Sequence, residues 1–201
     1  MGWTTEAGYD VLIQGNSNSC GLACCGMVIR SVKGDKMPES AMISESRRIG
    51  TGKYREYFSE RPGVVAIHGA SSVSKVTSVD KTGYLGTYVG NLGQILTNYL
   101  VENVTNWCPD PAAVIRGAGN MDLIALVNWD NGGGGHFVVV RNVGNDHMIV
   151  RDPYYGVSGQ AISGNYLPNN SRAIGATAKF NGWFVQPTGK ILAAPRVKVM
   201  F

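Results

Sequence analysis

Residues 14–29 read QGNSNSCGLACCGMVI, and the rest of the chain is organised around this stretch. Its polar residues end at Cys20, after which small and apolar residues follow almost without interruption. We therefore predict a helix over residues 20–32, with Ser19 or Asn18 as its N-cap. Because this helix is apolar on nearly every side, it should be buried in the core.

The predicted helix begins with a thiol. The N-terminus of a helix carries partial positive charge and N–H groups without intrahelical partners, and both stabilise a thiolate. Cys20 is therefore a candidate nucleophile. Gln14 precedes it by six residues on a loop that can fold back, so its side-chain amide can help to hold an oxyanion beside the thiol.

Composition limits the classes of function. The chain has 201 residues, which suits one large domain or two small lobes. The net charge of +4 comes from scattered basic residues that are not interleaved with aromatic residues, so nucleic-acid binding is not expected. No apolar run approaches the roughly 18–20 residues of a membrane helix, so no membrane partner is expected. The N-terminal sequence MGWTTEAGYD lacks the basic and apolar regions of a signal peptide.

The four cysteines do not form a disulfide framework, because three of them lie in the one predicted helix. Cys24 and Cys25 should be small buried hydrophobes, while a bridge to Cys108 stays open. The sequence has no CxxC pair and its three histidines are far apart, so a metal site is not expected. This usage fits a reducing compartment and one reactive thiol.

Hydrophobic periodicity favours helices in the first half of the chain and strands in the second. The first half should contain an irregular lead-in over residues 1–19, helices over 38–49 and 91–102, a helical turn over 53–60, a short apolar run over 64–67 and a loop over 71–86. The second half should contain a strand over 122–129, a hairpin of 137–143 with 148–151, a pair of 173–180 with 183–186 turned at Asn181-Gly182, and an edge strand from Ile191 onward. The expected fold is α+β in a single domain, with a helical lobe over about residues 14–105 and an antiparallel β-rich lobe over about 110–201.

His136 and Asp152 stand at matching ends of the predicted hairpin. His136 follows a glycine run and opens the first strand, and Asp152 ends the second strand 16 residues later. Across a hairpin, the two side chains can lie side by side on one face. This predicts a triad of Cys20 as nucleophile, His136 as general base and acid, and Asp152 as the group that orients the imidazole. We expect His147 to be a turn residue and His68 to serve packing or face solvent.

Gln14, the helix start Cys20-Gly21, His136 and Asp152 together resemble the papain-like cysteine peptidases. The phrases NSCGLACC, GHFVVVRNV and MIVRDPYYG are most similar to the bacteriocin-processing, double-glycine peptidase branch. The resemblance implies a two-lobe fold with a cleft between a helical and a β-rich lobe. It also implies peptide-bond hydrolysis after small residues such as Gly-Gly, without cofactor or metal. Papain has Asn at the orienting position, where this chain has Asp152.

The sequence departs from that branch in two ways. It carries no adjoining transporter membrane segments, and it has a long insert-like stretch over residues 37–90, between the helix of Cys20 and the helix predicted from residue 91. It also resembles bacterial effector and toxin domains that cut proteins inside a target cell. This second resemblance implies a protein substrate, a cognate immunity (inhibitor) protein, and a cytoplasmic location or delivery by a secretion system into a target-cell cytosol. Two alternatives stay open: a related acyl-transfer toxin, such as a glutamine deamidase or a transglutaminase-like enzyme, and a non-catalytic peptide-binding module that keeps the fold.

Overall fold

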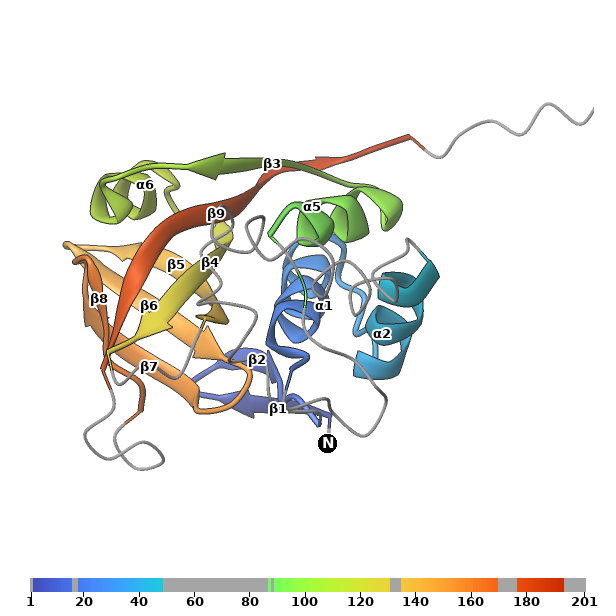
Figure 1. Ribbon diagram of the computed structural model, residues 1–201, viewed down its shortest axis with the longest axis horizontal. Coiled ribbons are helices and arrows are strands. Elements are labelled where there is room, and N and C mark those ends of the chain that lie inside the picture. Colours follow the sequence, from blue (N-terminus) through green and yellow to red (C-terminus); the bar gives the residue numbers. More distant parts are fainter. Residues whose placement is uncertain are drawn as a thin grey trace, which may run out of the picture.

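The computed structural model describes residues 2–15, 18–48, 87, 89–130, 135–169 and 177–193 (Figure 1). The predicted segments 53–60, 64–67 and 71–86, residues 173–176 of a predicted strand and the tail beyond 193 lie outside these residues. The described elements are, in chain order, β1 (Trp3–Glu6), β2 (Tyr9–Leu12), α1 (Cys20–Lys33), α2 (Glu39–Arg48), α5 (Val89–Asn98), β3 (Val101–Trp107), α6 (Pro111–Gly117), β4 (Asp122–Trp129), β5 (Gly135–Gly144), β6 (His147–Asp152), β7 (Gly156–Ala161), β8 (Asn165–Tyr166) and β9 (Ala178–Ile191).

Helix α1 begins at Cys20, as predicted, and ends one residue beyond the predicted limit. Gly34 follows in the left-handed conformation with φ 84°, and its N–H donates to the carbonyl of Arg30 at 2.9 Å, which is the usual glycine C-cap. Every residue from Gly21 to Ile29 is buried, because the helix packs against the sheet, α2 and α5 (Figure 1). The predicted burial of this helix is confirmed.

The larger sheet has seven strands in the described residues, with the order β3-β9-β4-β5-β6-β7 and with β8 paired to β9. Every pairing in it is antiparallel. Alternate side chains of β4 and β5 lie on opposite faces of the sheet and belong to two separate cores. One face packs against α1 and α5 through Ile124, Leu126, Phe137 and Val139. The other face packs with residues of α6 and β8 through Ala125, Val127, Val138 and Val140.

The strand over residues 122–129 and the hairpin of β5 with β6 are confirmed. Val139 lies opposite Arg151 in this hairpin, and the pairing continues to the turn at Asn145-Asp146. Both turn residues have positive φ, 51° and 57°, which is the two-residue turn that matches the twist of a hairpin.

Two predictions for the N-terminal half are wrong. Residues 1–19 are not irregular throughout, because β1 and β2 pair as a second, two-stranded sheet. The helix over 91–102 starts earlier, at Val89, and ends at Asn98. Leu100 then takes a positive φ of 64° and turns the chain into β3, where Val101 pairs with Ile191. Tertiary pairing with β9 thus overrides the apolar spacing that continued the helical pattern.

The turn predicted at Asn181-Gly182 is also wrong, because β9 runs without a break from Ala178 to Ile191. The register with β4 shifts between Ala125 opposite Phe184 and Val127 opposite Phe180, so this point is a bulge. Gly182 has φ 96°, and a Cβ there would lie 2.5 Å from the carbonyl oxygen of Cys108. Glycine is therefore needed at this position, both for the backbone conformation of the bulge and for the close approach of another backbone segment.

Four elements had no counterpart in the sequence analysis: α6, β7, β8 and all of β3 beyond residue 102. The signal for α6 was present, since Pro111 stands at the helix start and the Asp110 carboxylate accepts the Ala113 N–H at 3.1 Å. The α+β class agrees with the structure, in which helices and an antiparallel β-rich sheet both contribute to the core. The division into two lobes within a single domain stays a prediction.

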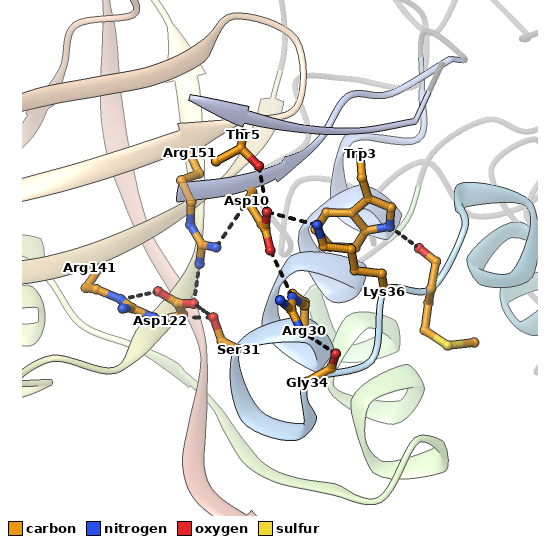
Figure 2. A network of polar contacts seen from close by, with 11 residues as sticks. Trp3, Thr5, Asp10, Arg30, Ser31, Gly34, Lys36, Asp122, Arg141 and Arg151 are labelled. Atoms are coloured by element: carbon orange, nitrogen blue, oxygen red, sulfur yellow. Dashed lines mark hydrogen bonds and ion pairs between the residues drawn. The ribbon is translucent and has the colours of Figure 1, made fainter. Parts of the chain in front are cut away.

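A polar network joins the sheet to α1 (Figure 2). Asp122 at the start of β4 is 3% exposed and accepts hydrogen bonds from the guanidinium groups of Arg141, at 2.7 Å, and Arg151. The hydroxyl of Ser31 on α1 donates to the same carboxylate. Since a buried carboxylate is costly unless it is paired, these donors make the junction between α1 and three strands specific.

A second carboxylate extends this network to the β1–β2 sheet (Figure 2). Arg151 also donates to the backbone oxygen of Asp10 at 3.2 Å, and the Asp10 side chain pairs with Arg30 at 2.9 Å and Lys36 at 3.0 Å. The hydrogen bond from Arg30 and that from Lys36 lower the pKa of Asp10 to about 2. Strand β2, which leads into the segment before Cys20, is thereby fixed to both α1 and β6.

Replacement of Gly182 tests the bulge in β9. We expect Gly182→Ala to lower the free energy of unfolding by at least about 2 kcal/mol, since its Cβ meets backbone and the backbone φ is unfavourable for alanine. Gly117→Ala is the matched control, because a Cβ there meets nothing within 4 Å and φ is not positive. Urea denaturation measures both, and equal stability of the two variants would contradict the bulge.

Candidate active site

Cys20 is the first residue of α1, is partly exposed, and lies against the start of β5. Gly21 makes this approach close. A Cβ at Gly21 would lie 2.9 Å from Leu92 Cδ2 and 3.1 Å from Phe137 Cδ2, so a larger residue would push the helix from the strand. The glycine after the thiol therefore brings Cys20 to His136, the residue before Phe137.

The thiol of Cys20 lies beside the imidazole of His136, and each group shifts the pKa of the other. Burial alone would raise the pKa of Cys20, but the charge and hydrogen bond of His136 and the N–H groups of Phe137 and Gly21 bring it below its ordinary value. Burial alone would lower the pKa of His136, but the charges of Asp152 and Cys20 and their hydrogen bonds raise it to about 10. The arrangement favours a thiolate beside an imidazolium.

His136 Nε2 lies 2.9 Å from Asp152 Oδ1. In the register of the hairpin, His136 is the diagonal neighbour of Asp152 on the same face, which places the two side chains within reach. The side-by-side arrangement predicted from the 16-residue separation is present. Because Nε2 is bound to the carboxylate, Nδ1 is the ring nitrogen left to exchange a proton with the thiol.

Asp152 is fully buried and surrounded by donors. Its Oδ1 also accepts the backbone N–H groups of Tyr154 at 2.6 Å and Tyr155 at 3.0 Å, and its Oδ2 accepts the hydroxyl of Tyr166 at 2.7 Å. Burial raises the pKa of this carboxyl, but the charge of His136 and these hydrogen bonds outweigh it and keep the pKa below its ordinary value. Asp152 is thus held ionised and in one orientation.

Trp129 and Tyr166 are site residues that sequence reasoning missed. The indole of Trp129 stacks on the imidazole of His136 with 5.6 Å between centroids and 29° between planes, and Tyr155 meets the indole edge-on at 5.6 Å. Trp129 closes the predicted strand β4, and its place beside His136 depends on the pairing of β4 with β5. Tyr166 lies on the two-residue strand β8, for which the sequence offers no signal.

Gln14 is buried just beyond β2, and its backbone N–H donates to the carbonyl of Pro153 at 2.9 Å. This bond joins the residue to the turn that follows Asp152. The structure therefore brings Cys20, His136 and Asp152 into one series, with a hydrogen bond between His136 and Asp152, and places Gln14 at the border of this series. The role of the Gln14 side chain as an oxyanion donor stays a prediction.

The remaining candidates lie apart from this series. His147 is exposed beside the hairpin turn, where its Nδ1 lies 2.7 Å from the Asn145 oxygen, and His68 is outside the described residues. Cys24 and Cys25 are fully buried, as predicted, and burial raises the pKa of both thiols. All four cysteines, Cys108 included, are free thiols. The described ranges contain no cluster of three side chains suited to hold a metal ion.

No helix among the described residues has the length and apolar character needed to cross a membrane.

No protein-family model matches the sequence, and no curated protein is similar to it. Among solved structures, the chain is similar to a double glycine motif protease from an AMS/PCAT transporter, determined in complex with the leader peptide. The TM-score is 0.50 at 16% sequence identity, over 88% of this chain and 89% of that chain. At this identity the likeness shows a common fold, in agreement with the papain-like fold that the sequence implied.

Alkylation by iodoacetamide tests the thiolate. We expect Cys20 to be labelled faster than the other three cysteines at pH 7, because its pKa is lowered whereas burial protects Cys24 and Cys25. Peptide mapping by mass spectrometry gives the rate at each site. Faster labelling of Cys108 in the folded protein would contradict the assignment.

The same assay over a range of pH tests the partner of the thiol. His136→Ala removes the positive charge but leaves the burial, so the midpoint of Cys20 alkylation should move to higher pH by about one unit or more. His147→Ala should leave the midpoint unchanged. A shift in the His147 variant in place of the His136 variant would show that the wrong imidazole was assigned.

Proposed function

We propose that this chain is a cysteine endopeptidase that hydrolyses peptide bonds of protein substrates. The observation that supports it most strongly is the series Cys20–His136–Asp152, in which a thiol at a helix N-terminus lies beside an imidazole that is hydrogen-bonded to a carboxylate. A partly exposed thiol of lowered pKa beside an imidazole of raised pKa is a nucleophile and a proton donor prepared for acyl transfer.

In the proposed first step, the Cys20 thiolate attacks the carbonyl carbon of the scissile bond. The carbonyl oxygen becomes an oxyanion that accepts the N–H of Cys20 and the side-chain NH2 of Gln14. His136 gives its proton to the leaving nitrogen, the C–N bond breaks, and the C-terminal part of the substrate departs as an amine. The N-terminal part remains as a thioester on Cys20.

In the second step, neutral His136 takes a proton from water, whose oxygen attacks the thioester carbon. Collapse of this intermediate breaks the C–S bond, releases a carboxylic acid and restores the thiolate–imidazolium pair. Asp152 keeps its charge throughout and orients the imidazole so that the second ring nitrogen faces the thiol. Tyr166 and the stacked Trp129 hold this arrangement in place.

We further propose that the scissile bond follows small residues, with Gly-Gly favoured. A substrate glycine lets the peptide backbone approach the thiolate closely, since it has no Cβ. The similar fold of a double glycine motif protease supports this preference. The phrases around the three residues add support, because they resemble the double-glycine branch.

A peptide with one internal Gly-Gly and one glutamine tests the activity. Cys20→Ala and His136→Ala should each reduce cleavage to background, Asp152→Ala should cost less, and Gln14→Ala should lower turnover by roughly 10²–10³-fold. Cys108→Ala and His147→Ala are matched controls that should cleave at the wild-type rate. Intact mass separates the reactions, because hydrolysis gives two fragments while deamidation adds about one dalton. An intact peptide carrying that added dalton would show that the protein is a deamidase and not a peptidase.

The setting inside a target cell is a further part of the proposal. An endopeptidase with a short recognition sequence is harmful to the cell that makes it, which is why a protein inhibitor is expected to accompany it. Expression in a bacterial cytosol should slow growth for the wild type and not for Cys20→Ala. Equal growth of the two strains at equal protein levels would contradict a toxin role. It would not bear on the peptidase activity, which the peptide assay tests separately.

A further inference from the structure

Glu39, the first residue of α2, binds both ends of the segment that separates Gln14 from Cys20. Its two carboxylate oxygens each lie 2.9 Å from the backbone N–H of Gly15, the residue after Gln14. Oε1 also accepts the hydroxyl of Ser19, the residue before Cys20, at 2.5 Å. One carboxylate therefore contacts the immediate neighbour of each residue that would supply an oxyanion donor.

We propose that Glu39 is a positioning residue that sets the distance and orientation between the Gln14 amide and the N-terminus of α1. The inference rests on the proposed function, in which these two groups bind the oxyanion. Glu39 does not touch the reacting atoms itself. It acts through Gly15 and Ser19, each one bond from the residue that does.

The conformation of Ser19 gives an independent reason for this role. Ser19 is the N-cap of α1, yet its side chain makes no capping hydrogen bond to the helix. A capping serine accepts an N–H of the second or third helical residue, here Gly21 or Leu22. The Gly21 N–H instead faces the Cys20 thiol closely enough to lower its pKa. By accepting the Ser19 hydroxyl, Glu39 holds this side chain in an orientation in which its oxygen makes no capping bond to the N–H.

The position of Glu39 suits a tether, by which we mean a side chain on one rigid element that holds Gly15 and Ser19 in place. It stands in the first turn of α2, where the helix dipole stabilises a carboxylate. Helix α2 packs directly on α1, and its Met42 and Ile43 are buried in the core that holds α1. The carboxylate is therefore carried by a packed helix and not by the segment that it restrains.

Steady-state kinetics on the Gly-Gly peptide test the tether. Glu39→Ala should lower kcat by about 10- to 100-fold and leave KM within about threefold, because misplaced catalytic groups affect the transition state more than substrate binding. Glu45→Ala is the matched control: Glu45 lies on the same helix but binds Arg48 and Asn98, both at 2.6 Å, and should leave kcat unchanged. An unchanged or higher kcat for Glu39→Ala would overturn the proposal.

A double-mutant cycle shows whether Glu39 acts through the oxyanion donors. If it does, adding Glu39→Ala to Gln14→Ala should cost much less than it costs in the wild type, since the positioned amide is already absent. Equal losses in both backgrounds would show that Glu39 affects activity by another route. Thermal unfolding of each variant checks that loss of folded protein does not explain the result.

Two measurements that need no substrate separate this proposal from the proposed function. Glu39→Ala should speed hydrogen exchange of the Gly15 amide, and it should slow alkylation of Cys20 at pH 7 because the Ser19 hydroxyl then claims the Gly21 N–H. If the wild type cleaves no peptide, the proposed function fails and these two rates still decide the tether. If either rate is the same in Glu39→Ala as in the wild type, the proposed role of Glu39 is wrong.

Discussion

The contact between the N-terminus of α1 and the start of β5 is the constraint on which the rest of the structure depends. It brings the thiol of Cys20 to the imidazole of His136, and it is close because Gly21 carries no side chain between the helix and Phe137. Two opposing effects act there. Burial disfavours the charged forms of both groups, yet each charge stabilises the other, and the N–H groups around the sulfur favour the thiolate. The pair is reactive only while this contact holds.

The sheet and its polar network supply the rigidity that such a contact needs. The two cores lie on opposite faces of β4 and β5, so the strand that carries His136 is packed on both sides. Arg151, the neighbour of Asp152, is buried and bound to Asp122 and to the backbone of Asp10. Helix α1, strand β2 and strand β6 therefore meet at fixed positions, and each of them carries or adjoins one residue of the proposed site (Figure 2).

Much of this site could be predicted because its signals are local in sequence. The start of α1 follows from the change from polar to apolar residues at Cys20, and the hairpin spacing is enough to pair His136 with Asp152. The sequence predicts a turn at Gly182, because an Asn-Gly pair is the usual turn signal. The structure instead needs glycine there for a bulge that meets Cys108 and Trp107 closely.

The features that were missed depend on contacts between distant residues. Tyr166 reaches Asp152 from a two-residue strand, and Trp129 reaches His136 only through the pairing of β4 with β5. Glu39 binds Gly15 across 24 residues, and its place in the sequence indicates no more than a favourable charge at a helix start. Periodicity and spacing cannot reveal such partners, since they report which face of an element is buried and not what lies against it.

Capture of the thioester on Cys20 tests the central claim most directly. The protein is mixed with the Gly-Gly peptide, quenched with acid within the first turnover, and weighed intact before peptide mapping. The account predicts an added mass equal to the N-terminal half of the peptide less the mass lost in forming the thioester, located on Cys20 and absent from Cys20→Ala. No adduct during turnover, or an adduct on Cys108, would contradict Cys20 as the nucleophile. An adduct containing the whole peptide would show attack on a side-chain amide in place of the peptide bond.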